Sequence, residues 1–392
     1  MKIAVIFESS PFDRKGLFNA VHERIRHLQK TGDHSIDVFC VHSRDNAFTR
    51  HARHTPKTPY VDSVEIEGIR YDLKWYRFSI LDHILFDRLH RRPLLFRRLK
   101  RRTVESLSGY DVLIGHSFVG SYLAYEAHCR YGTAFFANWH GSDVHTHPWR
   151  VPVLLDDTRK VMEAAVCNFF VSEALLDFSE RITRNAEKKV LYNGVSEKFV
   201  RFDEPVRDEV RRKFGVGQDA KSVSFAGNLS AVKNVRCLAP LFRMVSDRYD
   251  GQLKFFIAGD GKLRHCVEAD MREYGVDVRF MGNLPAEDMP SFMNATDVLV
   301  LPSLNEGLPL VCAEALRCGA NVAGSKVGGI PEIISPDFTV PLGSDFIETL
   351  AGLIVRMLEG GVVQEVPEEM DWSVTALKEQ RALDRLEFPR KP

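Results

Sequence analysis

Several features that would assign a chain to a large functional class are missing from this one. No window approaches the roughly 18 apolar residues of a membrane-spanning helix, and the opening residues, MKIAVIFESS, lack a signal cleavage site. Formal net charge is zero, from 53 basic and 53 acidic residues, which argues against nucleic-acid binding by the protein surface as a whole. We therefore expect the protein to remain in the cytoplasm, where it is made.

Cysteine provides no framework either. The seven cysteines are scattered and include no Cys-x-x-Cys pair, so the sequence predicts neither a zinc site nor a disulfide-stapled fold. Reduced and mostly structural thiols are the simplest interpretation, and they are typical of a cytoplasmic protein.

The chain is long enough for two domains. Its 392 residues exceed one ordinary core, and its 44% apolar and 27% charged residues are typical of a globular protein. Short apolar segments alternate with helical patterns in two successive blocks. The strands predicted in the first block are Lys2–Phe7, Ile36–Val41, Asp111–Gly115, Thr133–Trp139 and Ala164–Val171. Those predicted in the second block are Ser222–Ala226, Leu253–Ala258, Val278–Met281, Val298–Leu301 and Asn321–Gly324.

This alternation predicts the fold class. We expect an α/β protein with two doubly wound, Rossmann-like domains that face each other across a cleft. A charged segment with proline and glycine, residues 196–220, indicates the hinge, so the expected domains are residues 1–195 and 196–370. A further helical pattern covers Asp371–Leu386.

Polar residues just after the predicted strands are candidates for ligand contacts, because doubly wound sheets bind ligands beyond the carboxyl ends of their strands. His140 directly follows one strand, and Gly16 lies in the loop after the first strand. A simpler interpretation exists for each, since histidines often pack or face solvent and single glycines commonly make turns. The residues alone leave both interpretations open.

Two glutamates stand out in the second block. Glu306 lies in a glycine-flanked turn, and Glu314 lies in an apolar run that ends at a glycine. Proline suits a first helical position and glycine suits the position after a helix, which predicts a helix over Pro309–Cys318. Its uncapped start would bind an anion. Two solvated glutamates on an amphipathic segment explain the same pattern equally well.

Two known motifs are incomplete. The segment GHSFV, residues 115–119, has valine where the nucleophile elbow of serine hydrolases has its second glycine. After Gly259-Asp260-Gly261, Arg264 stands where a dinucleotide fingerprint has its third glycine. Serine hydrolysis and nicotinamide or flavin binding are therefore poorly supported.

Residues 77–102 combine helix-like apolar spacing with a run of basic residues that no acidic residue interrupts. This pattern is typical of a segment that binds an anionic membrane face or a phosphate-bearing acceptor. A solvated helix face whose arginine stems cover the core is the alternative. The basic residues are Arg88, Arg91, Arg92, Arg97, Arg98, Lys100, Arg101 and Arg102.

From about Leu191 to Ile334 the chain resembles a known family. The segments GNLSAVKN (227–234), FIAGDGKLR (256–264), 278–303 and 306–334 are similar to those of retaining, nucleotide-sugar-dependent glycosyltransferases with the two-domain type B (GT-B) fold. Glu306 and Glu314 match the family's motif of two glutamates with seven residues between them. The resemblance implies that the C-terminal residues 371–392 pack back on the first domain.

Carried over by position, the resemblance implies how the donor is bound. Glu314 would hold the ribose hydroxyls, and Glu306 would contact hydroxyls of the transferred sugar. Lys233 would neutralise the leaving diphosphate, which the amides around Leu308 and Leu310 would also bind.

The remaining roles implied by the resemblance concern the reacting sugar, the phosphates and the base of the donor. His140 would face the reacting sugar, and Gly16 would belong to the glycine loop under the phosphates. Gly282 lies in the backbone from Met281 to Leu284 that would flank the base.

One position departs from the family pattern. Asn228 stands where the family commonly has arginine. Asparagine can donate a hydrogen bond to a phosphate but cannot neutralise it, and one lost electrostatic donor costs about a hundredfold in rate. The glycine pair common near the first loop is reduced to Gly16.

The resemblance implies a hexosyltransferase-like reaction in which an acceptor hydroxyl attacks the anomeric carbon from the face that the diphosphate leaves, with retained configuration. It implies no metal and no cofactor, and the sequence has no Asp-x-Asp pair. The donor would be a UDP-sugar, and the acceptor a saccharide or lipid-linked saccharide of the cell envelope at the inner membrane face. A catalytically weak sugar-nucleotide-binding subunit, suggested by Asn228, and a sugar-nucleotide epimerase of related fold are the alternatives.

Overall fold

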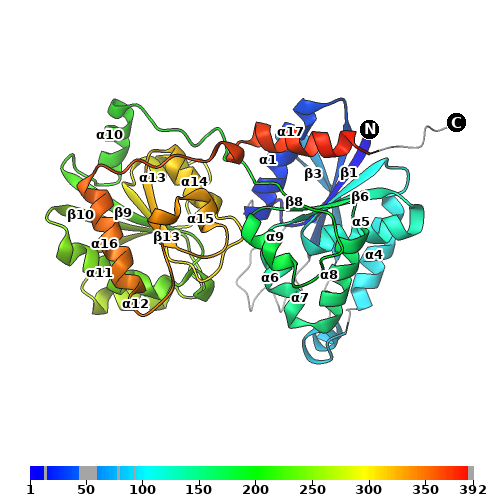
Figure 1. The fold of residues 1–392 in the computed structure, drawn as a ribbon, viewed down its shortest axis with the longest axis horizontal. Coiled ribbons are helices and arrows are strands. Elements are labelled where there is room, and N and C mark those ends of the chain that lie inside the picture. The colour runs from blue at the N-terminus through cyan, green and yellow to red at the C-terminus, as the bar shows by residue number, and fades with distance from the viewer. Residues whose placement is uncertain (13–15, 44–59, 77–79, 92–93, 387–392) are drawn as a thin grey trace. The chain divides into compact units, whose positions relative to one another are not determined.

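The computed structural model describes residues 1–12, 16–43, 60–76, 80–91 and 94–386, and the chain divides into two compact units (Figure 1). The N-terminal unit consists of Met1–Asn193 together with Trp372–Pro392, and the C-terminal unit is Gly194–Asp371. The chain therefore passes from one unit to the other after Asn193 and returns after Asp371.

The N-terminal unit is built on an eight-stranded sheet with the order β3-β4-β2-β1-β5-β6-β7-β8. Neighbouring strands are parallel except at the edge, where β3 and β4 form an antiparallel hairpin. Residues Ile3–Phe7 are at most 1% exposed, as expected for a parallel strand covered on both faces. The strands are β1 (Lys2–Glu8), β2 (Ser35–Ser43), β3 (Ser63–Ile66), β4 (Ile69–Tyr76), β5 (Val112–His116), β6 (Ala134–Trp139), β7 (Cys167–Phe170) and β8 (Lys188–Val190).

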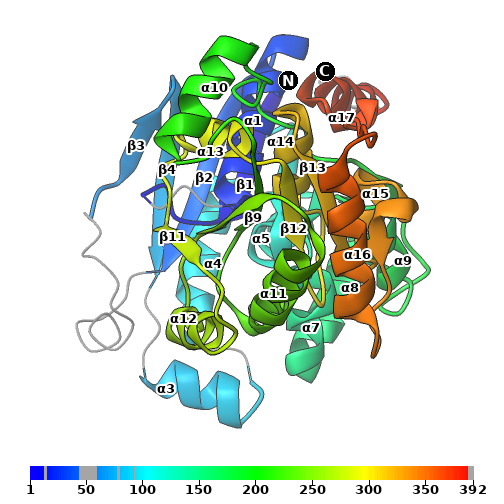
Figure 2. The ribbon, with the colours of Figure 1, turned by 90° about the vertical axis from the view of Figure 1, so that its left-hand side faces the viewer.

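Helices cover both faces of this sheet (Figures 1 and 2). Helices α1 (Gly16–Thr31) and α17 (Trp372–Asp384) lie side by side, and Phe18 and Ile25 of α1 share one core with Val5 of β1. Helix α5 (Ser117–Tyr131) packs against β1, β5 and β6. The other helices of this unit are α3 (Ile80–His83), the π-helical turn η1 (Ile84–Arg88), α4 (Leu94–Ser106), α6 (Ser142–His145), α7 (His147–Arg150), α8 (Pro152–Ala164) and α9 (Glu173–Ser179).

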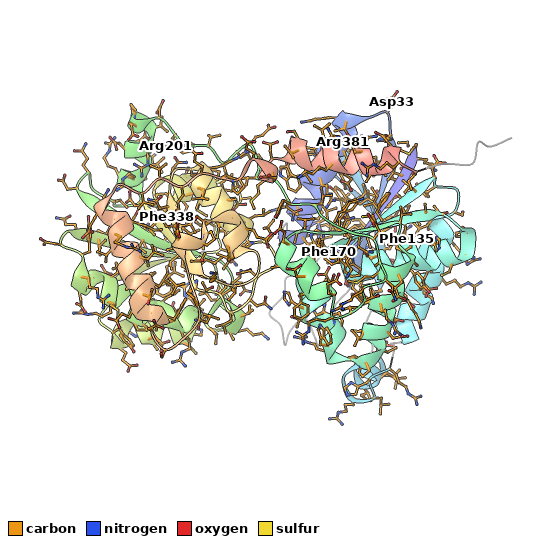
Figure 3. The ribbon with its side chains drawn as sticks, in the orientation of Figure 1. Asp33, Phe135, Phe170, Arg201, Phe338 and Arg381 are labelled. Atoms are coloured by element: carbon orange, nitrogen blue, oxygen red, sulfur yellow. The ribbon has the colours of Figure 1, made fainter. Side chains whose placement is uncertain are left out.

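Aromatic rings fill much of this core. Phe135 of β6 and Phe170 of β7 are completely buried (Figure 3). Burying such a side chain contributes about 1.5–3 kcal/mol, so each of these two rings stabilises the unit.

The C-terminal helix α17 is tied to the N-terminal unit by polar contacts as well. Arg24 Nε donates to Glu379 Oε2 over 2.7 Å, and both side chains are only 3% exposed. The hydroxyl of Thr375 donates to the carbonyl of Tyr192 over 2.7 Å. The last helix therefore belongs to the N-terminal unit, although the whole C-terminal unit lies between them in the sequence.

The C-terminal unit is built on a six-stranded sheet, all parallel, with the order β11-β10-β9-β12-β13-β14. Helices α11, α12 and α16 lie on one face, and α10, α13 and α14 lie on the other (Figure 2). The strands are β9 (Ala220–Ala226), β10 (Gln252–Ala258), β11 (Val278–Gly282), β12 (Val298–Leu301), β13 (Asn321–Ser325) and β14 (Thr339–Val340). The helices are α10 (Glu204–Lys213), α11 (Leu238–Arg248), α12 (Arg264–Glu273), α13 (Met289–Asn294), α14 (Leu310–Arg317), α15 (Ile330–Ile333) and α16 (Phe346–Glu359), with short 3-10 turns at Ala231–Lys233, Val235–Cys237, Pro336–Phe338 and Glu368–Met370.

Most predicted strands differ from those in the structure by only one or two residues at an end, and two of the differences in extent have a clear physical reason. The helix predicted over Pro309–Cys318 is α14, which begins at Leu310, because Pro309 has ψ of 88° and is the N-cap instead of the first helical residue. The strand predicted over Ala164–Val171 is shortened to β7, because helix α8 continues through Ala164.

The basic segment 77–102 is not one helix. Its described part consists of α3, the π-helical turn η1 and, beyond Arg91, helix α4. Arg92 lies outside the described residues, and so do the side chains of Arg97 and Arg98. Within the described ranges, no helix is both long enough and apolar enough to cross a lipid bilayer.

Candidate functional site

Three glycine-containing loops meet at the carboxyl ends of β9, β10 and β11. The Gly259 amide donates to the Gly282 carbonyl over 2.6 Å, and the Gly227 amide donates to the Ala258 carbonyl over 2.9 Å. A Cβ at Gly259 would lie 2.0 Å from the Gly227 carbonyl oxygen. Only glycine allows this close approach, which places Gly282 beside the loop that carries Lys233.

Lys233 and Glu306 form the central contact of this region. Lys233 ends a short 3-10 turn, and its Nζ lies 2.5 Å from Glu306 Oε1. Their side chains are 21% and 11% exposed, so solvent screens the pair only in part. The amide of Leu304 donates to the carbonyl of Val232 over 2.8 Å, which joins the two loops through their backbones as well.

Glu306 is also held by residues at the ends of β12 and β13. The hydroxyl of Ser303 donates to Glu306 Oε1 over 2.6 Å, and the hydroxyl of Ser325 donates to the Ser303 carbonyl. Gly328, with φ of +50°, lies so close that a Cβ there would be 2.0 Å from the Glu306 carbonyl oxygen. Ser303, Ser325 and Gly328 were not among the site residues predicted from the sequence.

Helix α14 begins directly after this loop. Its N-cap, Pro309, provides no side-chain acceptor. Among the described residues, the backbone amides of Leu308 and Leu310 have no hydrogen-bond acceptor. Free amides and the helix dipole together favour an anion at this position.

Glu314 lies in the second turn of α14. Its carboxylate forms no hydrogen bond or ion pair with any side chain or backbone group that the structure describes. Burial raises the pKa of Glu314 to about 7. A carboxylate that is desolvated without a partner costs stability, and ligand hydroxyl groups would remove that cost.

Asn228 is placed against the loop that follows β10. Its Oδ1 would lie 2.3 Å from a Cβ at Gly261, and the neighbouring Leu229 amide donates to the Asp260 carbonyl over 3.0 Å. Asn228 is nevertheless exposed. Asn228 therefore lies in the same loop as Lys233 but brings no positive charge to it.

His140 lies at the carboxyl end of β6 in the N-terminal unit. Its Nε2 lies 3.1 Å from Nδ1 of His116, the last residue of β5. The Asp143 carboxylate accepts the amides of His140 and Gly141 over 3.1 and 2.7 Å, and Gly141 adopts φ of 143°. These contacts fix the turn that presents His140.

The histidine pair is uncharged. Burial and, after it, the positive charge of Arg24 lower the pKa of His140 to about 3. The same two causes, and then His140 itself, hold the pKa of His116 well below its ordinary value. Burial raises the pKa of Asp143 to about 6 although the amide hydrogen bonds oppose this rise. At neutral pH the two imidazoles can therefore exchange hydrogen bonds but bring no charge.

The structure divides the predicted site residues between the units. The loops of the C-terminal unit bring together Asn228, Lys233, Gly282, Glu306 and the start of α14. His140 belongs to the N-terminal unit and meets His116. Gly16 is also in that unit, where it is the first residue of α1 with φ of +29°, and a Cβ there would meet no described residue beyond its own helix. The strand-end position of His116 was the sequence signal that could have identified it.

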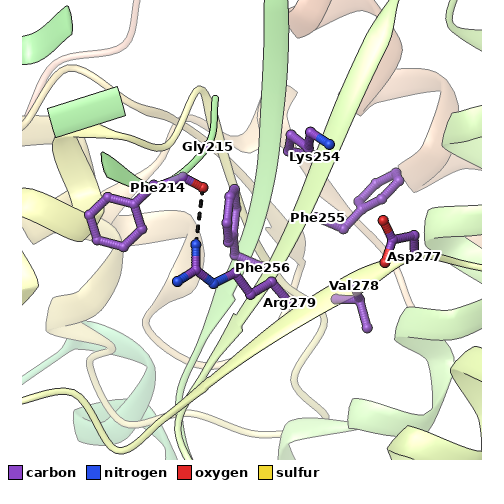
Figure 4. A pocket seen from close by; sticks show the side chains of 8 residues that line it. All are labelled: Phe214, Gly215, Lys254, Phe255, Phe256, Asp277, Val278 and Arg279. Carbon is purple, nitrogen blue, oxygen red and sulfur yellow. Dashed lines mark hydrogen bonds between the residues drawn. The ribbon is translucent and has the colours of Figure 1, made fainter. Parts of the chain in front are cut away.

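A surface hollow of about 420 Å³ lies elsewhere on the C-terminal unit (Figure 4). Arg279 donates across it to the Phe214 carbonyl over 3.3 Å, and Lys254 and Val278 lie in the first halves of β10 and β11. This hollow is therefore at the end of the sheet opposite to the loops of Lys233 and Glu306.

The C-terminal unit is the part of the chain that resembles a known protein family. Residues 206–372 match the family model of glycosyl transferases group 1. The C-terminal unit is similar to the group 1 glycosyltransferases over these residues. A curated relative, D-inositol 3-phosphate glycosyltransferase of Corynebacterium urealyticum, is 31% identical over 147 residues, which cover 36% of this chain and 35% of the relative. The chain spans between 35% and 44% of the length of such relatives.

Solved structures resemble the whole chain. Sucrose-phosphate synthase from Thermosynechococcus elongatus has a TM-score of 0.68 at 18% identity, over 98% of this chain and 94% of that chain. HepE of Anabaena in complex with UDP and glucose has a TM-score of 0.67 at 15% identity, over 97% of this chain and 95% of that chain. The two units together therefore have the GT-B fold, which confirms the predicted fold class.

Proposed function

We propose that this protein is a retaining glycosyltransferase that moves a sugar from a nucleoside-diphosphate sugar to a hydroxyl group of a saccharide or lipid-linked acceptor. The Lys233–Glu306 pair beside the free amides at the start of α14 carries this proposal. A lysine and a helix start attract a diphosphate, and two nearby carboxylates can accept hydrogen bonds from sugar and ribose hydroxyls. The match of this unit to the group 1 family supports the same conclusion.

The chemistry assigned to these groups is electrostatic. Lys233 and the amides of Leu308 and Leu310 would stabilise the negative charge that develops on the leaving diphosphate. Glu306 would orient the transferred sugar, and Glu314 would hold the ribose. His140, which is neutral, would donate or accept a hydrogen bond at the sugar without adding charge.

The donor in this proposal is a UDP-sugar. HepE of Anabaena, which shares the fold, was solved with UDP and glucose. The experiment is to incubate the protein with a panel of labelled UDP-, GDP- and ADP-sugars and candidate acceptors, and to measure transfer and slow donor hydrolysis. Transfer with retained configuration supports the proposal, and a released isomer of the donor would indicate an epimerase instead.

A catalytically weak sugar-nucleotide-binding subunit is the second candidate, and Asn228 favours it. Lys233 and the helix start are then the only positive groups assigned to the diphosphate. Nucleotide binding in calorimetry, together with neither transfer nor hydrolysis for any donor, would support this second candidate. Restored turnover in an Asn228→Arg variant would show that the missing charge is the reason.

We also propose that the reaction needs no metal and takes place in the cytoplasm. Lys233 and the dipole of α14 supply positive charge that a metal ion would otherwise supply. The seven cysteines are all free, which fits a reducing compartment. Unchanged turnover after treatment with EDTA would support metal independence, and recovery of turnover only with a divalent ion would contradict it.

The acceptor in this proposal lies at an anionic membrane surface, as in cell-envelope polysaccharide synthesis. Leu81, Ile84 and Leu89 of the α3–η1 region are 53%, 41% and 57% exposed, and Arg88 and Arg91 beside them are exposed as well. Apolar and basic side chains on one short segment favour the interface of an anionic bilayer.

Liposome sedimentation tests this surface. Binding to phosphatidylglycerol vesicles should weaken as salt rises, and it should be lost when Arg88, Arg91, Arg101 and Arg102 are replaced by serine. Replacement of Arg243 and Arg248, which are exposed on the C-terminal unit, serves as the matched control. Binding that survives the first replacement and ignores salt would contradict the proposal.

A further inference from the structure

Ser303 is a buried serine whose hydroxyl is directed to a site carboxylate. It follows β12, is 0% exposed, and donates to Glu306 Oε1 over 2.6 Å. The same oxygen lies 2.5 Å from Lys233 Nζ. One carboxylate oxygen therefore has two donors, of which one is charged and partly exposed and the other is neutral and buried.

The backbone around Ser303 is fixed by three neighbouring loops. The hydroxyl of Ser325, at the end of β13, donates to the Ser303 carbonyl. The Leu304 amide donates to the Val232 carbonyl over 2.8 Å, and Gly328 lies against the backbone of Glu306. The protein itself therefore holds Ser303 in place, whereas the long side chain of Lys233 has several rotatable bonds.

The two donors must respond differently when an anion binds. A diphosphate attracts Lys233 away from Glu306, because it offers more negative charge than one carboxylate. Glu306 is only 11% exposed, so water cannot fully replace the lost cation. The Ser303 hydroxyl is the contact that remains.

We propose that Ser303 is a positioning residue that holds the Glu306 carboxylate in place while Lys233 exchanges that carboxylate for the diphosphate of the donor. This inference rests on the proposed function, since it names how the same site changes partners. No covalent step is involved, because only hydrogen bonds and ion pairs are exchanged.

The inference predicts a division between binding and turnover. Ser303→Ala should change the affinity for UDP less than twofold, because Glu314 and the amides at α14 are untouched. It should lower kcat for the nucleotide-sugar about tenfold or more, since a hydrogen bond to a charged group contributes more than one between neutral groups. A merely structural serine would instead lower stability and leave kcat of the folded protein unchanged.

Ser222→Ala is the matched control. Ser222 is also 0% exposed, lies in the same unit and donates to a carboxylate, Asp297 Oδ2, over 3.0 Å. We expect it to lower the melting temperature to a similar degree without changing kcat. An equal fall of kcat in both serine variants would overturn the inference.

A double-mutant cycle with Glu306→Ala tests whether Ser303 acts through Glu306. In the Glu306→Ala background, Ser303→Ala should change kcat less than twofold. The same factor in both backgrounds would show that Ser303 acts on something else.

Hydrogen exchange tests the contact without any ligand. We expect amides of residues 304–307 to exchange about tenfold faster in Ser303→Ala and at the wild-type rate in Ser222→Ala. Unchanged exchange in both variants would overturn the positioning role. If wild type turns over no donor, the proposed function fails, and the exchange experiment still decides whether Ser303 holds this loop.

Discussion

The two units place opposite electrostatic environments at the carboxyl ends of their strands. The C-terminal unit has the ion pair of Lys233 and Glu306 beside the free amides of a helix start. The N-terminal unit has His116 and His140, which burial and the charge of Arg24 keep neutral. A charged pair can exchange partners with an anion, whereas a neutral imidazole pair can only donate and accept hydrogen bonds.

This difference matches the two ends of the proposed substrate. A nucleoside diphosphate carries concentrated negative charge, and a sugar offers only hydroxyl groups. The same parallel α/β architecture thus supports either kind of site, because the loops and not the sheet decide which groups lie at its edge.

The largest expected effect on turnover comes from the ion pair of the C-terminal unit. Lys233→Ala should lower turnover of the donor at least about a hundredfold, because the leaving diphosphate loses its cation. Steady-state kinetics with the nucleotide-sugar that wild type uses provide the measurement. Lys254→Ala, at the opposite end of the same sheet, should leave turnover unchanged. Equal turnover in the Lys233 variant and wild type would remove the basis of the comparison.

The next largest effect is on stability, and it comes from the backbone around Glu306 in the C-terminal unit. Gly328→Ala should lower stability more than Gly275→Ala in differential scanning calorimetry. Both glycines have positive φ, +50° and +63°, but only at Gly328 would a Cβ meet a neighbour, 2.0 Å from the Glu306 carbonyl oxygen. Left-handed strain alone costs about 1–2 kcal/mol, so the additional loss at Gly328 measures the close approach. Equal losses would mean that the Glu306 loop can move aside.

A smaller effect on turnover is expected from the histidine pair of the N-terminal unit. His140→Ala should lower turnover about tenfold, the value of one neutral hydrogen bond, and not the hundredfold expected for a charge. His128→Ala is the control, because His128 belongs to the same unit and its Nδ1 is within hydrogen-bond distance, 3.0 Å, of the Thr133 carbonyl, outside the proposed site. A loss as large as that of Lys233→Ala would indicate that His140 does more than bond a hydroxyl.

The smallest effect is a difference between the two units in how stability depends on pH. The pKa of Glu314 is raised from 4.5 to about 7 by burial, so the native state binds its proton more tightly and stability falls as pH rises through that range. The pKa of His140 is lowered from 6.5 to about 3, first by burial, so stability falls as pH decreases below 6.5.

Two variants separate these opposite slopes. Relative to wild type, Glu314→Gln should gain stability as pH rises from about 5 to 7.5, and His140→Gln should gain it as pH falls below about 6. Thermal unfolding at a series of pH values is the measurement. Parallel curves for both variants and wild type would contradict the assigned pKa shifts.

Much of the fold could be predicted from local pattern. Buried parallel strands give apolar runs such as Lys2–Phe7 and Val298–Leu301, and both lie within strands of the structure. The edge hairpin β3–β4 was missed, although Tyr71 and Leu73 alternate with polar residues and Glu67-Gly68 forms a positive-φ turn between the strands. Its strands are exposed on one side, so their pattern is weaker than that of the central strands.

The sequence by itself determined the alternation of strands and helices, the glycines of the loops and the order of Lys233, Glu306 and Glu314 along the chain. These features depend on neighbours within a few residues, which is why they can be recognised locally. The role of each polar residue depends on which groups lie within about 3 Å of it. No local sequence pattern specifies these contacts.

Only the tertiary structure decided those contacts. It brought Lys233 to Glu306 across 73 positions, His116 to His140 across 24, and Arg24 to Glu379 across 355. The physical reason is that parallel strands bring their carboxyl ends to one edge whatever their separation in sequence, and burial there then sets the charge. The residue types fixed which groups could pair, and the packing of sheets and helices fixed which of them did.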